Sequence, residues 1–268
     1  MSPRIEADGM LQVEDDDAGI RTLVMNVPGK RNAMNPVLRA QLIAAVEDGV
    51  HDSRVRALVI GGANGDFCAG GDLGALSELP PSELPELLAS GHRLLRAIVR
   101  APKPVVAAIE GHAAGGGAGL ALACDFVVMS RGARFGFPFL SIGLVPDWGL
   151  MYSLTRRAGA GMARRLLLHP IPVDAANAVG WGLADEIVED GQAEQRAKSL
   201  AATLAVPSPH AWARTKQALE TVQRGFDEAL SEELHAQVEC FGSEEFRRGV
   251  SGFLARRHSS PASKASAP

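Results

Sequence analysis

The segments Phe67-Cys68-Ala69-Gly70-Gly71-Asp72-Leu73 and Gly111-His112-Ala113-Ala114-Gly115-Gly116-Gly117-Ala118-Gly119 are the most informative for the fold of this chain. Each follows a short β-branched run, at 58–60 and at 105–109, and each leads into a helix-compatible stretch. Glycine permits tight turns and close approach to backbone N–H groups. Two such turns side by side could direct two N–H donors at one oxygen, which is the arrangement of an oxyanion hole. The second turn would also lie at a helix N-terminus, which favours negative charge.

Around these segments, strand and helix patterns alternate. Strands are expected at 11–14, 20–27, 57–61 and 126–129, and helical spacing of apolar residues predicts helices at 36–51 and 82–100. This alternation predicts an α/β fold with right-handed crossovers. After about residue 147, only 186–188 has a strand pattern, and helices are expected at 148–158, 161–168, 174–180, 191–205, 208–224, 227–240 and 243–256.

The chain is therefore predicted to contain an α/β core at 1–200, a helical region at 201–257 and a disordered tail at 258–268 rich in Ser, Ala and Pro. The net charge of -4 predicts no general attraction to nucleic acid or to anionic membranes. The longest apolar stretch, 105–129, contains Glu110, His112 and Asp125, which favours a buried element over a membrane span.

The three cysteines, Cys68, Cys124 and Cys240, are widely spaced and form no C-x-x-C pair. This spacing disfavours a disulfide framework or a zinc site and fits reduced thiols in a cytoplasm. The first 17 residues carry six acidic side chains and no apolar core, so they do not resemble a secretory signal. We therefore expect a cytoplasmic protein.

Several linked motifs resemble the crotonase (enoyl-CoA hydratase/isomerase) superfamily. The first glycine segment resembles the family's F-[SC]-A-G-[AG]-D-[LI], and 111–125 resembles its G-x-[AV]-x-G-G-G-x-x-L-x-x-x-C-D. Lys30-Arg31-Asn32-Ala33-Met34 resembles the N-A-[LM] loop, Gly143-Leu144-Val145-Pro146-Asp147 a further block, and 249–257 the closing E-G-x-x-A-F-L-x-K-R. The motifs follow the family's order over about residues 10 to 257.

The resemblance implies a spiral of ββα units followed by a helical C-terminal trimerisation region, hence a homotrimer or a hexamer built as a dimer of trimers. It also implies an acyl-CoA thioester as substrate. Coenzyme A would be part of that substrate, so no separate cofactor and no metal are expected. The family's two oxyanion donors correspond to the N–H groups of Gly71 and Gly116, which would stabilise an enolate.

The resemblance also assigns substrate contacts. Lys30 and Arg31 match the loop near the adenine and phosphates of coenzyme A, and Arg257 belongs to the basic closing motif. Phe139 and Trp148, together with Phe137, are expected to form an apolar acyl pocket. The full set of predicted substrate-binding residues is Lys30, Arg31, Ala33, Ala69, Gly70, Asp72, Leu73, Phe139, Trp148 and Arg257.

The departures from the family concern the reaction. Hydratases of the family resemble each other in carrying glutamates at two positions, which are Gly119 and Phe139 here. Neither residue can transfer a proton. Asp147 remains, in a loop where double-bond isomerases of the family carry their single catalytic carboxylate. One carboxylate suffices for an isomerase, and apolar surroundings would raise its basicity.

Alternatives stay open at this point. Pro146-Asp147 before a helical stretch is also a good N-cap, which needs no catalytic role. The reaction could instead be a hydration that uses an acid from elsewhere, a ring rearrangement, a thioester hydrolysis, or acyl-CoA binding without turnover. Structural roles are expected for a further set of polar or nucleophilic residues, with His112 and Cys68 packed: Cys68, Asp72, Glu110, His112 and Asp125.

Overall fold

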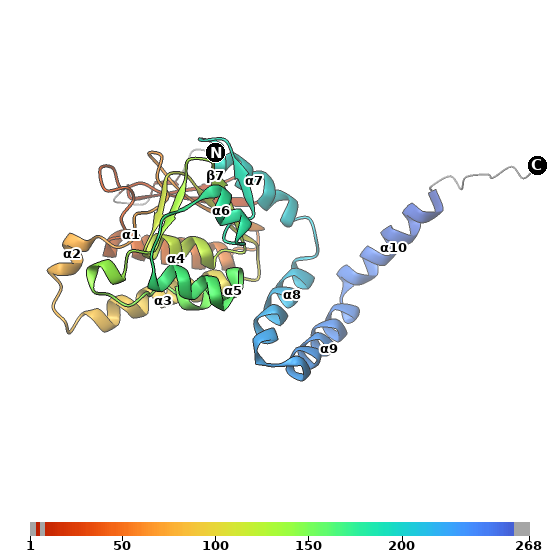
Figure 1. Cartoon of the computed structure of the whole chain (residues 1–268). Helices are drawn as coiled ribbons and strands as arrows, with labels where there is room; N and C mark the ends of the chain where they lie inside the picture. The colour runs from red at the N-terminus through yellow and green to blue at the C-terminus, as the bar shows by residue number, and fades with distance from the viewer. Residues whose placement is uncertain (1–3, 6–8, 260–268) are drawn as a thin grey trace, which may run out of the picture. The chain divides into compact units, whose positions relative to one another are not determined.

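A computed structural model describes residues 4–5 and 9–259 of this chain, with side chains from 9 to 255 apart from residue 223. The chain forms two compact units, Met1–Val206 and Pro207–Pro268 (Figure 1). The predicted boundary at residue 200 lies inside a helix, α7, of the first unit. Within the described residues, no helix combines the length and the apolar character needed to cross a bilayer.

The first unit contains two sheets. The larger has the order β1-β2-β3-β4-β5-β7-β10; β1 to β3 pair antiparallel, and every pair from β3 to β10 is parallel. Its strands are β1 (Arg4–Ile5), β2 (Leu11–Asp15), β3 (Ile20–Met25), β4 (Ala57–Gly62), β5 (Val105–Ile109), β7 (Phe126–Ser130) and β10 (Glu186–Val188). The smaller sheet pairs β6 (His112–Ala114), β8 (Arg134–Gly136) and β9 (Val173–Asp174) in the order β6-β8-β9.

The helices of the first unit lie on both faces of the larger sheet. They are α1 (Pro36–His51), α2 (Leu73–Ser77), α3 (Leu84–Val99), α4 (Gly116–Ala123), α5 (Leu150–Leu168), α6 (Ala175–Gly180) and α7 (Ala193–Leu204), with a 3₁₀ turn η1 (Leu140–Ile142). The second unit consists of α8 (Pro209–Thr221), η2 (Val222–Arg224), α9 (Phe226–Gly242) and α10 (Glu244–Ser259). The mixed α/β architecture predicted from the sequence is confirmed.

The alternation of side chains along β4 explains the layers. Leu58 and Ile60 join the core shared with α1, α3, α4 and α5, whereas Ala57 and Val59 join a second core on the other face. Successive strand residues point to opposite faces, so an uninterrupted apolar run needs a cover on each side. On α7, alanines recur every four residues from Ala193 onward, and they pack at close range against this second face.

Two sequence-based expectations need correction. The predicted tail begins at residue 258, but α10 continues to Ser259; residues 260–268 lie outside the described part. Residues 148 and 149 were expected to begin a helix, whereas α5 begins at Leu150. The sequence predicts two helices, at 148–158 and 161–168, and the structure has an interruption between them at Gly159, whose φ is 77°.

Candidate active site

The two glycine segments meet because they follow neighbouring strands. Parallel β4 and β5 pair Leu58 with Val105, so their carboxyl ends lie at the same edge of the sheet. Beyond that edge the segments are joined by two backbone bonds: Cys68 N–H donates to His112 O at 2.9 Å, and Ala114 N–H to Cys68 O at 2.9 Å.

Gly70 brings the two backbones into close contact. Its φ is 97°, and a Cβ there would lie 2.8 Å from Ala114 O and 3.3 Å from the nitrogen of Gly116. The left-handed conformation and the lack of space both require glycine.

The backbone leaves two N–H groups available at this junction. Gly71 is bridged to Met34, with Met34 N–H donating to Gly70 O at 2.7 Å and Asp72 N–H to Met34 O at 3.3 Å. This pattern directs the N–H of Gly71 away from Met34. Gly116 is the first residue of α4, so its N–H has no partner one turn earlier. Neither N–H has a protein acceptor among the described residues.

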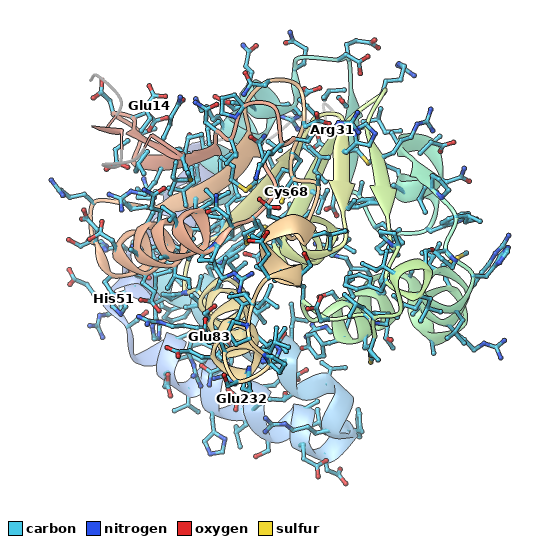
Figure 2. All side chains as sticks on the ribbon, turned by 90° about the vertical axis from the view of Figure 1, so that its left-hand side faces the viewer. Glu14, Arg31, His51, Cys68, Glu83 and Glu232 are labelled. Atoms are coloured by element: carbon cyan, nitrogen blue, oxygen red, sulfur yellow. The ribbon has the colours of Figure 1, made fainter. Side chains whose placement is uncertain are left out.

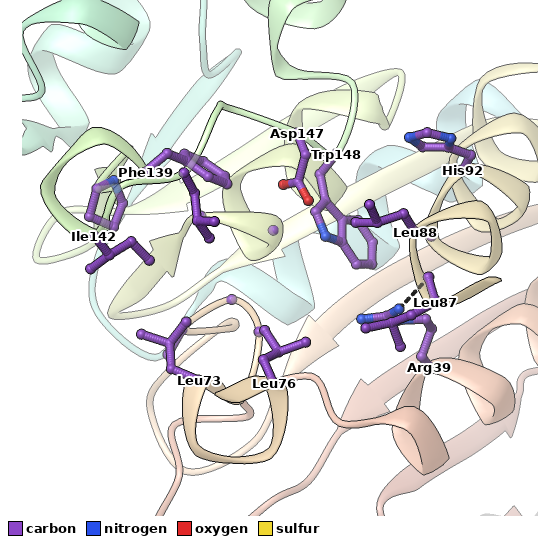
Figure 3. A pocket seen from close by; sticks show the side chains of 18 residues that line it. Arg39, Leu73, Leu76, Leu87, Leu88, His92, Phe139, Ile142, Asp147 and Trp148 are labelled. Atoms are coloured by element: carbon purple, nitrogen blue, oxygen red, sulfur yellow. Dashed lines mark hydrogen bonds between the residues drawn. The ribbon is translucent and has the colours of Figure 1, made fainter. Parts of the chain in front are cut away.

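A pocket with about 130 Å³ of free space opens at this junction (Figure 3). Most of its side chains are apolar, and its titratable ones are Arg39, His92 and Asp147. The lining residues are Arg39, Ala69, Gly70, Gly71, Leu73, Leu76, Leu87, Leu88, Gly91, His92, Gly115, Gly116, Pro138, Phe139, Ile142, Leu144, Asp147 and Trp148. Predicted site residues from three separate sequence motifs therefore lie in one cavity.

Asp147 brings a partly buried carboxylate to this pocket. Its Oδ1 atom is buried and has no hydrogen-bond partner among the described residues. Burial raises the pKa of the Asp147 carboxyl above its usual value, while the charges of Arg39 and, more weakly, of His92 act in the opposite direction. The N-cap interpretation is wrong, because the cap of α5 is Gly149 and no side chain caps that helix.

Trp148 occupies space that three glycines leave free. A Cβ on Gly119 would lie 2.4 Å from Cβ and 2.5 Å from O of Trp148. A Cβ on Gly116 would lie 2.8 Å from the indole Nε1, and one on Gly91 3.5 Å from the ring. Trp148 itself has a φ of 51°, a left-handed conformation that costs a non-glycine residue about 1–3 kcal/mol. At Gly119, the first of the two positions where hydratases of the family carry glutamate, there is therefore no room for a side chain.

Arg39 supplies the second buried charge. It belongs to the first turn of α1 and is 5% exposed. The Nη1 group donates to Leu87 O at 2.6 Å and to Ser90 Oγ at 3.2 Å, whereas Nε is buried without a partner. The guanidinium lies 5.4 Å from the ring centroid of Trp148 (Figure 3).

The loop at 30–34 supports the first glycine segment from outside the pocket. The buried Asn32 fixes the loop, because its Oδ1 accepts from Val27 N–H at 2.8 Å and its Nδ2 donates to two backbone oxygens. Ala69 N–H then donates to Arg31 O at 2.9 Å, and Ala33 is buried.

Four charged side chains were predicted to bind the substrate. Lys30 and Arg31 belong to this loop, Asp72 is paired with Lys30, and Arg257 has no described side chain. Lys30 and Arg31 are exposed (Arg31 in Figure 2). Lys30 Nζ lies 2.6 Å from Asp72 Oδ2, and Arg31 Nε lies 3.9 Å from Asp66 Oδ2. Asp72 caps α2 through Ala75 N–H, and Lys30 holds the pKa of the Asp72 carboxyl below its usual value. Lys30, Arg31 and Asp72 are not among the residues that line the cavity. The side chain of Arg257 lies outside the described residues.

Two aromatic or polar residues differ from the sequence-based expectation. Phe137 does not line the pocket; it is buried and stacks on Phe135 with 6.3 Å between ring centroids. His112 is not packed in the core but half-exposed, and its Nδ1 lies 2.7 Å from Asp66 Oδ1.

Three further residues have the structural roles expected for them. Burial raises the pKa of the Cys68 thiol to about 11, so it is a poor nucleophile (Figure 2). Glu110 accepts from Ala193 N–H at the start of α7, and Asp125 accepts from Val105 N–H.

Several pocket residues could not be identified from the sequence. A lone arginine in an amphipathic helix is typical of a solvated face, so Arg39 carried no signal. The others lie on α2 and α3, in or beside η1, and directly before α4. The pocket residues absent from the prediction are Arg39, Leu76, Leu87, Leu88, Gly91, His92, Gly115, Pro138, Ile142 and Leu144.

Comparison with known proteins shows the family to which this chain belongs. The family model described as enoyl-CoA hydratase/isomerase matches residues 15–261. The 1,2-epoxyphenylacetyl-CoA isomerase of Escherichia coli is 35% identical over 246 residues, covering 90% of this chain and 94% of that protein. The short-chain-enoyl-CoA hydratase of Clostridium acetobutylicum is 30% identical, covering 91% of this chain and 94% of that protein.

A solved structure supports the same family. The enoyl-CoA hydratase/isomerase from Cupriavidus metallidurans has a TM-score of 0.85 at 32% identity, covering 92% of this chain and 94% of that one. The fold and these likenesses define an acyl-CoA-processing enzyme with the crotonase fold. The chain belongs to the enoyl-CoA hydratase/isomerase family.

Proposed function

We propose that this protein is an acyl-CoA isomerase that converts a 3-enoyl-CoA into a 2-enoyl-CoA. Asp147 acts as the base, and the N–H groups of Gly71 and Gly116 hold the thioester oxygen. The observation that carries the proposal is the partly buried carboxylate of Asp147, whose Oδ1 atom has no partner among the described residues, in the same pocket as these two N–H groups.

The reaction needs one group that accepts and returns a proton. The Asp147 carboxylate removes a proton from carbon 2, and the electrons of the broken C–H bond enter the conjugated system. Negative charge gathers on the thioester oxygen, where each N–H donor contributes about 2.7–4 kcal/mol of stabilisation. The protonated Asp147 then delivers the proton to carbon 4, which restores the thioester carbonyl and leaves the double bond between carbons 2 and 3.

Among the described residues that line the pocket, Asp147 is the one carboxylate, and this supports isomerisation over hydration. Hydration needs one group to activate water and another to handle the proton. Asp147 is the acid among the pocket's lining residues, and Phe139 lines it at the second hydratase position. Substrate and product of an isomerisation have the same composition, so the proposed reaction needs no redox cofactor.

A rearrangement of an aromatic-derived epoxide is the second candidate. It is favoured by the 35% identity to a protein named 1,2-epoxyphenylacetyl-CoA isomerase and by the rings of Phe139 and Trp148 in the pocket. Such a reaction would also conserve mass and would use the same oxyanion donors.

The proposal includes assembly as a homotrimer, or as a hexamer built from two trimers, through the helices of the second unit. The support is the exposure of large apolar side chains on α9, where Phe226 is 77% and Leu234 64% exposed in the single chain. Light scattering of the purified protein checks this: a monomer at micromolar concentration contradicts it.

The test of activity uses pure protein with 3-enoyl-CoA in heavy water, read by mass spectrometry. A rearranged product with no added water supports the isomerase, and its deuterium content measures how often the protonated Asp147 exchanges with solvent before it reaches carbon 4. A product heavier by one water means hydratase chemistry, and no conversion directs attention to 1,2-epoxyphenylacetyl-CoA as the second substrate. D147N, measured in parallel, identifies any turnover that does not depend on Asp147.

A further inference from the structure

Arg39 is buried and Asp147 is partly buried with a buried Oδ1 atom, and no direct ion pair joins them among the described residues. Arg39 is 5% exposed, and its two hydrogen bonds go to neutral oxygens of Leu87 and Ser90. A buried cation is costly unless a negative charge lies nearby. The acid among the residues lining the same pocket is Asp147.

Trp148 connects the two charges. It follows Asp147 in the chain, and the guanidinium of Arg39 lies 5.4 Å from its ring centroid. In Figure 3 the indole lies between the carboxylate of Asp147 and the guanidinium of Arg39. Because the ring also packs on the glycines of α3 and α4, it can move little, and the separation of the two charges is fixed.

We propose that Arg39 is a positioning residue for the reaction, whose guanidinium supports the ring of Trp148 and keeps Asp147 ionised across it. This inference rests on the proposed role of Asp147 as the base. An apolar pocket suits an acyl chain but favours a neutral carboxyl, and a neutral carboxyl cannot accept a proton. The guanidinium of Arg39, which is hydrogen-bonded to α3, favours the ionised form of Asp147. Because the two groups form no direct ion pair, the carboxylate stays free to accept a proton from the substrate.

The charges that face Asp147 come from two helices. They are Arg39 on α1 and His92 on α3, and His92 is exposed, so solvent screens it. The segments Gly116–Ala123 of α4 and Leu73–Ser77 of α2 contain no titratable side chain. Arg39 is accordingly the largest of the effects that oppose the desolvation of Asp147, and the backbone N–H of Asp147 and the side chain of His92 contribute less.

The experiment follows the ionisation of Asp147 directly. Carboxyl-carbon NMR of protein labelled at aspartate identifies Asp147 as the resonance that D147N lacks. In R39M the titration midpoint of that resonance should move to higher pH, whereas in R39K, which keeps the charge, it should stay close to that of the wild type. R39Q, which retains a donor for Leu87 O, replaces R39M if R39M does not fold.

A second readout uses turnover. Relative to the wild type, the neutral variant should lose about three- to tenfold more activity at pH 5 than at pH 8, since one pH unit corresponds to tenfold. A structural role alone would lower activity equally at both values. A midpoint that stays unchanged in a folded neutral variant overturns the inference.

The NMR midpoint does not depend on turnover, so failure of this inference and failure of the proposed function are distinguishable. If the wild type does not isomerise 3-enoyl-CoA but the midpoint moves as expected, the electrostatic role of Arg39 stands and the proposed reaction does not. If the wild type isomerises and the midpoint does not move, the reverse holds.

Discussion

A Cβ atom on Gly119 would lie 2.4 Å from the Cβ atom of Trp148, a separation that real side chains do not adopt. The glycine at the first hydratase position and the tryptophan beside Asp147 are therefore parts of one arrangement. The ring fills the space over α4, and the loop that carries Asp147 is held against the helix by that packing. A glutamate could not be restored there without moving Trp148.

The first prediction concerns this contact. G119A should destabilise the protein by about 1–3 kcal/mol, because the added methyl group overpacks a site bounded by the backbone of Trp148. The matched control is G161A in α5, where a Cβ would meet nothing within 4 Å. That variant should be neutral or stabilising by about 0.5–1 kcal/mol, since alanine favours helices. Denaturant unfolding measures both, and equal effects would contradict the packing argument.

Much of the fold could be predicted because its signals are local. The run around Leu58 and Ile60 is β-branched and apolar, and α1 coincides with the predicted 36–51. The strands β6, β8 and β9 could not be predicted, since two or three residues carry no periodicity and pair only through tertiary contacts.

The site was predictable to the extent that glycine and motif spacing determine it. Gly71, Gly116 and Asp147 come from three motifs and line one cavity in the structure. Arg39 was not predictable, because its burial depends on where α3 crosses α1. The unpartnered Oδ1 atom of Asp147 was not predictable either. The dipeptide Pro146-Asp147 is also typical of an N-cap, and the structure shows that the cap of α5 is Gly149.

The second prediction tests Asp147 in turnover. D147N should lower isomerase activity by about 10²–10⁴-fold, because the amide cannot accept the proton from carbon 2. Asp174, the N-cap of α6, offers a matched control: D174N makes the same chemical change in a side chain that accepts from Asn177 N–H. It should keep nearly full activity. Steady-state rates with 3-enoyl-CoA compare the two variants, and a fully active D147N would remove Asp147 from the mechanism.

The third prediction concerns the loop beside the first glycine segment. R31E should weaken acyl-CoA binding by about three- to tenfold at low salt, and the effect should shrink as salt screens the charges. Arg31 is 63% exposed and lies 3.9 Å from the carboxylate of Asp66, so its charge is only partly compensated. R54E, at a more exposed arginine paired with Asp52, is the control. Calorimetric titration at two salt concentrations measures both, and a salt-independent loss in R31E would indicate a conformational cause.

The fourth prediction links the ionisation of Asp147 to stability. Because burial raises the pKa of this carboxyl in the folded protein, the folded state binds its proton more tightly than the unfolded chain does. Stability is therefore lost as pH rises from the carboxyl's usual range through the raised pKa, and the loss is complete above it. D147N has no charge to desolvate, so it should melt at a higher temperature than the wild type at pH 7, and this difference should shrink towards pH 4. Thermal melts of both proteins from pH 4 to pH 7 measure this difference in melting temperature. A difference that grows on acidification would contradict the prediction, because it would mean that attraction to Arg39 outweighs the desolvation of Asp147.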